Sequence, residues 1–107
     1  MASIGGMGNL LKQAQEMQAR MAKIQEELGQ KTVEGSAGGG MVQVTVNGQF
    51  NLVAVKIEPS VINSSEKEML EDLVLAAVND GMRKARELAS SEMSKLTGGL
   101  KIPGLMP

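Results

Sequence analysis

Six basic side chains have the types and spacing that suit contacts with phosphate groups. They are Lys12, Arg20 and Lys23 in one predicted helix, and Arg83, Lys84 and Arg86 in another. Lys12 and Lys23 are separated by three helical turns, so they share one outward face, and Arg20 lies close to it. Lys and Arg side chains that contact phosphate position a protein on nucleic acid without reading its bases. These six residues are the candidate nucleic-acid site.

The plainer interpretation of the first group is a solvated surface with local ion pairs. Each cation has an acidic neighbour four positions away, in the pairs Lys12–Glu16, Arg20–Glu16 and Lys23–Glu27. Such pairs stabilise a helix by only ~0.2–0.5 kcal/mol each. The formal net charge of -1 also gives no overall attraction to a polyanion. Both interpretations therefore stay open at the level of the sequence.

The residues that carry most enzymatic and metal chemistry are missing. There is no Cys for thiolate chemistry or metal ligation, and no His, the commonest general base. The glycine-rich stretch 35–40 is followed by Met41, whereas a phosphate-binding P-loop needs Lys and Ser or Thr there. A run of carboxylates, at residues 66, 68, 71 and 72, fits the first turns of a helix, where acidic side chains favour the positive end of the dipole. We expect no enzyme activity, no cofactor and no metal site.

The shortage of aromatic residues limits the kind of nucleic acid that could be bound. Phe50 is the single aromatic residue, so there is no platform on which unpaired bases could stack. No helix-turn-helix, zinc-finger or basic-zipper pattern is present. Phosphate contacts by Lys and Arg remain, and binding of that kind is modest and steeply dependent on salt.

These cations must be positioned by helices, and the first helix carries a narrow apolar seam. The seam residues are Met7, Leu10, Ala14, Met17, Met21, Ile24 and Leu28. They alternate at steps of three and four from about Asn9 to Gly29 or Gln30, a pattern that usually requires a partner helix. Either a second long helix of the same chain or a second copy of the chain could cover it. The residues expected to carry this packing are Leu10, Met17, Met21, Ile24 and Leu28.

Three extended segments are expected after this helix. A short run at 32–34 leads into the glycine-rich stretch, and Met41–Val46 alternates as a half-buried strand does. Asn47-Gly48 is typical of a type I′ hairpin turn. The returning strand is predicted over Phe50–Ile57, with Val53, Val55 and Ile57 on one face.

A second long helix is expected next. Ser65 with Glu68 is typical of a capping box, and Thr97-Gly98-Gly99 is a stop signal. The first half of this helix, through Val78, is apolar around most of its circumference and should be buried on more than one side. The chain is therefore predicted to form one domain over residues 1–97, with a flexible tail over 98–107.

Together these elements predict an α+β protein of order α-β-β-β-α. The simplest assembly is a three-stranded antiparallel sheet flanked by the two long helices. Because the sheet is small, the helices should project beyond it or pack against another protomer.

Several blocks of the sequence resemble the YbaB/EbfC family of bacterial nucleoid-associated proteins. They are the segments 6–15 and 17–18, the glycine-rich loop, 44–48, 57–60, 69–74, 76–77 and 79–80. The resemblance implies a tweezer-like homodimer whose long helices project as arms. It also implies binding of double-stranded DNA with little sequence preference, association with the nucleoid, and a role in gene expression or nucleoid organisation. By position on the arms, the DNA contacts would fall to the six basic residues named above.

The predicted function is thus a cytoplasmic, nucleoid-associated homodimer that holds duplex DNA by phosphate contacts. The lack of Cys suits a reducing compartment, and no apolar stretch is long enough to cross a membrane. The alternative is a protein-interaction adaptor whose Met-rich arms clasp a protein partner of DNA metabolism, since Met surfaces adapt to varied partners.

Overall fold

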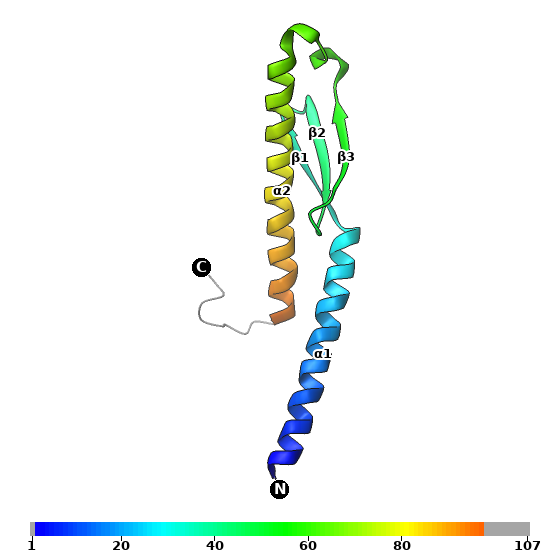
Figure 1. Cartoon of the computed structure of the whole chain (residues 1–107), viewed down its shortest axis with the longest axis vertical. Helices are drawn as coiled ribbons and strands as arrows, with labels where there is room; N and C mark the ends of the chain where they lie inside the picture. Colours follow the sequence, from blue (N-terminus) through cyan, green and yellow to red (C-terminus); the bar gives the residue numbers. More distant parts are fainter. Residues whose placement is uncertain (1, 98–107) are drawn as a thin grey trace.

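The chain folds into two long helices and a small sheet in the expected order (Figure 1). The computed structural model describes residues 2–97, and the predicted tail at 98–107 lies outside them. The elements are α1 (Ala2–Gln30), β1 (Thr32–Ala37), β2 (Val42–Asn47), β3 (Leu52–Ile57), two short 3-10 turns η1 (Pro59–Val61) and η2 (Ser64–Glu66), and α2 (Lys67–Thr97). None of the helices within the described part has the length and apolar character that a membrane span requires.

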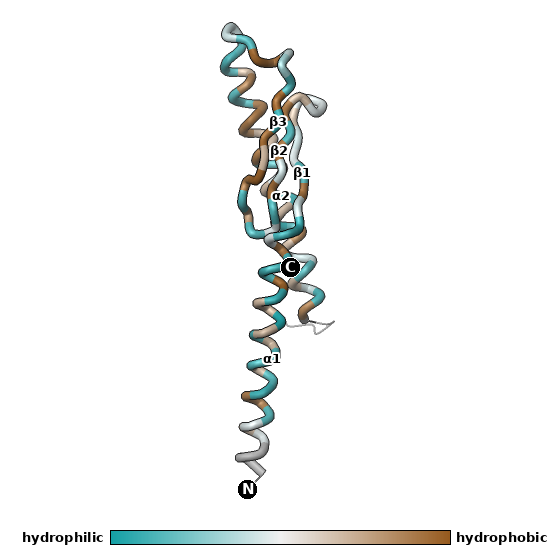
Figure 2. The backbone as a smooth tube through the Cα atoms, turned by 90° about the vertical axis from the view of Figure 1, so that its right-hand side faces the viewer, coloured by the Kyte–Doolittle hydropathy of each residue, from teal (hydrophilic) through white to brown (hydrophobic). Residues whose placement is uncertain are grey.

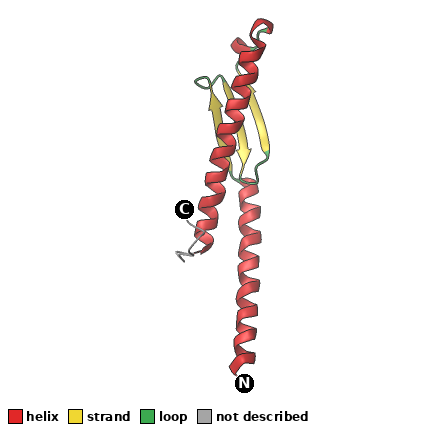
Figure 3. Ribbon diagram, turned by 60° about the vertical axis from the view of Figure 1, so that its left-hand side comes forward, coloured by secondary structure: helices red, strands yellow, loops and turns green. Residues whose placement is uncertain are grey.

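The molecule is elongated because the two helices overlap only near their C-terminal ends. Its principal extents are 78 × 26 × 17 Å. Helix α2 lies across the sheet, whereas α1 leaves the sheet edge and continues well past the end of α2 (Figures 1 and 3). The N-terminal part of α1 is thus a single-helix arm in the isolated chain.

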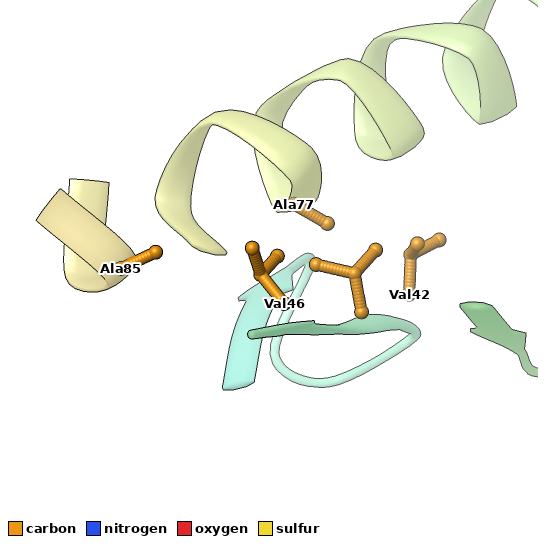
Figure 4. Close-up of a cluster of buried hydrophobic side chains, with 5 residues drawn as sticks. Val42, Val46, Ala77 and Ala85 are labelled. Atoms are coloured by element: carbon orange, nitrogen blue, oxygen red, sulfur yellow. The ribbon is translucent and has the colours of Figure 1, made fainter. Parts of the chain in front are cut away.

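The core is a two-layer packing of α2 on one face of the sheet. The strands are antiparallel in the order β1-β2-β3, as expected. The central strand buries Val42, Val44 and Val46 against Ala77 and Ala85 of α2 (Figure 4). Small alanines on the helix let its backbone approach the valines closely, so this aliphatic core needs no aromatic residue.

A backbone contact fixes where α2 crosses β1. A Cβ added at Gly35 would overlap the backbone of Ala77 and Gly81, so only glycine fits at this crossing. This contact also explains why β1 extends to Ala37, beyond the short run expected at 32–34, since Gly35 and Ser36 pair with β2 instead of forming a loop. The turn is confined to Gly38, Gly39 and Gly40, all of which have positive φ.

The β2–β3 connection differs from the predicted type I′ turn. Neither Asn47 nor Gly48 has positive φ, and the left-handed residue is Phe50, with φ 66°. The Asn47 side chain accepts hydrogen bonds from the backbone N–H groups of Gln49 (2.9 Å) and Asn51 (3.0 Å). Gly48 donates its N–H to the Leu28 carbonyl at 2.8 Å, and a Cβ at Gly48 would lie 2.7 Å from that oxygen. Gly48 therefore contacts the end of α1, and Asn47 stabilises the loop. This contact with α1 requires a longer loop than a two-residue type I′ turn.

The third strand starts at Leu52, not at Phe50, and contains a bulge. Val44 pairs with Val55 and Val46 with Leu52, with a register shift between Thr45 and Val46. Val53 is the residue of β3 without a partner in this register, so the regular alternation expected over Val53, Val55 and Ile57 is interrupted before Val55. Leu52, Val55 and Ile57 pair with the core valines of β2 and share the face of the sheet on which α2 lies.

Both helix starts differ from prediction. Helix α1 begins at Ala2 rather than near Asn9, because propagating a formed helix adds a hydrogen bond per residue and nothing packs against the glycines of this segment to redirect it. The expected Ser65–Glu68 capping box is absent. Asn63 takes its place, accepting a hydrogen bond from the Ser65 backbone N–H at 3.1 Å.

The first half of α2 is less buried than predicted. Ala77 is fully buried, but Leu75 is 62% exposed and Met69 is 39% exposed. The reason is geometric: α2 covers β1 and β2 but leaves β3 uncovered, so its side toward β3 has no partner within the chain. Figure 2 looks onto this side and shows apolar stretches on both β3 and the upper part of α2.

Candidate nucleic-acid interface

The three candidate cations of α1 lie on its exposed surface. Lys12, Arg20 and Lys23 are all exposed. The local ion pairs expected with Glu16 and Glu27 are not formed, and within the described part of the chain these three side chains make no hydrogen bond or ion pair. Their charges are therefore available to an external anion.

Arg20 and Lys23 lie at a cleft between the two helices. The cleft has a volume of about 290 Å³ and is lined by Arg20, Lys23, Ile24 and Glu27 of α1 and by Glu92, Lys95 and Leu96 of α2. Because α2 ends beside the middle of α1, its last turn adds the cation of Lys95 to those of α1. The cleft thus brings together three cations and two carboxylates from two segments that are far apart in the sequence.

A buried carboxylate holds this junction together. Glu92 is only 7% exposed, and its Oε1 accepts hydrogen bonds from Lys31 Nζ at 2.8 Å and Lys95 Nζ at 3.2 Å. The hydrogen bond from Lys31, with help from Lys95, holds the pKa of Glu92 below its ordinary value. The same contact raises the pKa of Lys31. Glu92 therefore stays ionised at neutral pH and ties the start of β1 to the last part of α2.

The second candidate group is divided by its contacts. Arg83 is held between Asp80 (2.9 Å) and Glu87 (2.8 Å), and the pKa of its guanidinium is raised chiefly by the bond to Asp80. Lys84 lies 3.2 Å from Asp80 and donates to the Glu34 carbonyl at 3.1 Å. Both cations thus have partners within the chain, while their side chains remain 55% and 40% exposed.

Arg86 differs from its two neighbours. It is exposed and makes no ion pair or hydrogen bond with any described residue. The following helical turns separate it from Leu96, ten residues on, so it lies roughly 15 Å from the cleft along α2. The structure therefore does not bring the two predicted groups together: Arg83 and Lys84 lie beside β1, whereas Lys12, Arg20 and Lys23 lie on the arm.

Comparison with known proteins identifies the family of this chain. Residues 4–100 match the model of the YbaB/EbfC DNA-binding family. The chain belongs to this family. A nucleoid-associated protein of Desulfotalea psychrophila is 56% identical over 99 residues, covering 92% of this chain and 93% of the relative. A nucleoid-associated protein of Thermoanaerobacter pseudethanolicus is 57% identical over 99 residues, covering 92% of this chain and 89% of the relative.

The YbaB/EbfC fold is also found among solved structures. The crystal structure of an uncharacterized protein from Helicobacter pylori has a TM-score of 0.71 with this chain at 27% identity. The structural alignment covers 86% of this chain and 94% of the Helicobacter pylori chain. The resemblance inferred from the sequence blocks is thereby confirmed, and so is the α+β fold.

Lys31 and Lys95 are the basic residues of this YbaB/EbfC chain that sequence reasoning missed. Neither belongs to a basic run, and the one local signal was the spacing of Glu92 and Lys95, which places them one helical turn apart. The position of Lys95 beside Arg20 and Lys23 depends on where α2 stops along α1. Among the described residues, no group of three or more potential ligands could hold a metal ion.

Proposed function

We propose that this protein binds double-stranded DNA with low sequence preference, through phosphate contacts made mainly by α1. The observation that carries the proposal is the unpaired state of Lys12, Arg20 and Lys23 on an exposed helix in a chain of a DNA-binding family. Cations without an internal partner lose no ion pair when they contact phosphate. Arg86 adds a further cation from α2.

The chemistry of the surface favours duplex over single-stranded DNA. Phe50, the sole aromatic side chain, lies in the β2–β3 loop. Without aromatic stacking, little energy is available for unpaired bases. Regularly spaced phosphates of a duplex match cations that repeat along a helix.

We infer further that the functional form is a homodimer. The uncovered side of β3 and α2 forms a mainly apolar groove, with Leu52 and Val55 exposed on the same strand as its member Ile57. The residues that line the groove are Ile57, Leu70, Glu71, Val74, Leu75 and Val78. Monomeric proteins rarely expose contiguous apolar surface of this kind. A second copy presents the same surface, so an isologous contact would bury both and leave the two α1 arms projecting.

Such a dimer would carry two sets of arm cations, consistent with a place on the nucleoid in the cytoplasm. The names of the two relatives above, both nucleoid-associated proteins, support the same role. An influence on gene expression or nucleoid organisation would follow from coating, bending or bridging the duplex.

Gel-shift titrations with duplexes of unrelated sequence, each over a salt series, test the proposal. Each phosphate contact contributes about -0.9 to the slope of log affinity against log salt, so the four cations of each protomer that contacts the DNA contribute roughly -3.6. Affinities within a few-fold of one another across sequences are expected. Absence of binding at low salt, or an affinity indifferent to salt, would refute phosphate-based binding.

The rival function is the adaptor that clasps a protein partner. The exposed Met7, Met17 and Met21 on α1 are the observation in its favour. An experiment in cells distinguishes the two functions. Replacing Lys12, Arg20 and Lys23 with Gln should release the protein from the nucleoid if it binds DNA. The same replacement should leave its distribution unchanged if an apolar protein partner holds it there.

A further inference from the structure

The apolar seam of α1 is only partly used by the fold. Its C-terminal members pack as predicted, with Leu28 buried and Ile24 half-buried beside Leu96 of α2. Its N-terminal members do not: Leu10 is 67% exposed, Met17 39% and Met21 42%. The seam runs as one continuous stripe along α1. The part beside the end of α2 is covered, and the part beyond that end is exposed.

The chain itself continues from the point where this cover ends. Helix α2 runs antiparallel to α1, and its last turn lies at the cleft with Ile24, a member of the seam (Figure 1). Residues that follow Thr97 in the same direction would therefore proceed along the uncovered half. The remaining sequence, 98–107, is Gly-Gly-Leu-Lys-Ile-Pro-Gly-Leu-Met-Pro.

The composition and length of this segment fit the seam. It carries four apolar side chains, at Leu100, Ile102, Leu105 and Met106, and a single charge. Ten residues in an extended conformation reach ~33 Å, whereas the seam from Met21 to Met7 is roughly 21 Å long. Pro103 disfavours a helix, so an extended strip is the conformation expected to lie along the arm.

We propose that residues 98–107 dock on the uncovered apolar seam of α1 in their own chain. The covered stripe would then extend from Leu28 to the apolar patch formed by Met7, Leu10 and Leu11. Attachment to α2 makes docking intramolecular, with an effective concentration in the mM range that another molecule would have to match. The docked segment stiffens the arm, and it does so independently of any bound DNA.

Crosslinking tests this docking directly, because the chain has no cysteine of its own. The full-length double variant Met17→Cys with Ile102→Cys places one thiol on the seam and one on the segment. The matched control is Gln15→Cys with Ile102→Cys, since Gln15 is two residues from Met17 and points to the opposite side of the helix. A short bis-maleimide reagent is used because it still joins the two thiols if the segment is displaced along α1 by one or two residues.

We expect at least ten times more intrachain crosslink from the Met17 pair than from the Gln15 pair, measured by peptide mass spectrometry. Equal yields from the two pairs would overturn the proposal. Mixing isotopically labelled and unlabelled chains identifies the source of the segment. Crosslinks that join labelled to unlabelled chains would show that the seam is covered by another copy, which also overturns it.

A second measurement uses substitutions that leave α1 intact. Leu105→Ser with Met106→Ser should increase amide hydrogen exchange over residues 7–21 several-fold, while exchange in β2 stays unchanged. Unaltered exchange over 7–21 would contradict docking of the segment on the arm.

Discussion

The Asp80 carboxylate of α2 accepts a hydrogen bond from the backbone N–H of Ser36 in β1, with Oδ2 and N 3.0 Å apart. Asp80 also binds Arg83 and Lys84. The bond from Ser36 is the largest of the causes that lower the pKa of Asp80 to about 2. This carboxylate therefore joins helix to sheet, and it pairs with two of the candidate DNA-binding cations.

The protein should lose stability in acid as Asp80 is protonated. Because the pKa of Asp80 is lowered in the folded state from 3.8 to about 2, its contribution is complete above pH ~4 and is lost as the pH falls toward 2. Urea unfolding between pH 6 and pH 2 measures this loss. Asp80→Asn should lower the free energy of unfolding at pH 6 and make it decrease less as the pH falls from about 4 toward 2.

The Asp80→Asn profile needs a matched control. Asp72 lies on the same helix, is exposed, and makes no ion pair with a described residue. Asp72→Asn should keep the wild-type profile. An unchanged acid limb in Asp80→Asn would show that the Ser36 contact does not contribute to stability.

Gly35→Ala should destabilise the fold because the added methyl group overlaps the backbone of α2. Overpacking of a well-packed site costs about 1–3 kcal/mol, which chemical denaturation resolves easily. Gly8→Ala is the control, since nothing lies within 4 Å of a Cβ at Gly8 on the arm. That change should raise helix content slightly, because alanine is favoured over glycine in a helix by about 1 kcal/mol. Equal stability of Gly35→Ala and wild type would mean that α2 can move away from β1.

The order of elements could be predicted from the sequence because hydrophobic period and turn residues are local signals. The alternation at Met41–Val46 marked the buried central strand correctly, with Val42, Val44 and Val46 on the core face. Details that depend on contacts between distant segments could not be predicted. The Asn47-Gly48 loop is shaped by Leu28 at the end of α1, and the bulge at Val53 interrupts the regular alternation of β3.

The candidate site shows the same limit. Exposure of Lys12, Arg20 and Lys23 followed from the helical period, because they lie off the apolar seam. The ion pairs of Arg83 and Lys84 with Asp80 and Glu87 are local too, at three and four residues along α2. The bonds from Lys84 to the Glu34 carbonyl and from Ser36 to Asp80 could not be predicted, since they require β1 to lie beside α2. Charge spacing along one helix identifies possible ion pairs but does not decide which of them form: Arg83 pairs with Glu87, whereas Lys23 at the same spacing does not pair with Glu27.

Leu75→Glu should convert the proposed dimer into a folded monomer. Leu75 is 62% exposed in the single chain, so the substitution leaves the core intact, whereas a dimer contact at this groove would bury the new charge without a partner. Light scattering at micromolar concentration should fall from twice the chain mass to 11.3 kDa. Gln43→Glu, on the polar face of the sheet, should remain dimeric. A wild-type mass of 11.3 kDa would refute the dimer itself.

Arg20→Gln and Lys23→Gln should weaken DNA binding, whereas Arg83→Gln should chiefly reduce stability. Each phosphate contact removed makes the salt slope less negative by about 0.9, so the Arg20/Lys23 double variant should change it by about 1.8 in one protomer. Arg83 already has two acidic partners, and its removal leaves Asp80 bound only to Lys84 and Ser36. Arg83→Gln should therefore unfold at a lower temperature and keep the wild-type salt slope. Gel shifts and thermal melts on the same preparations separate the two effects, and a salt slope that changes with Arg83 but not with Arg20 and Lys23 would place the DNA beside the sheet instead of along the arm.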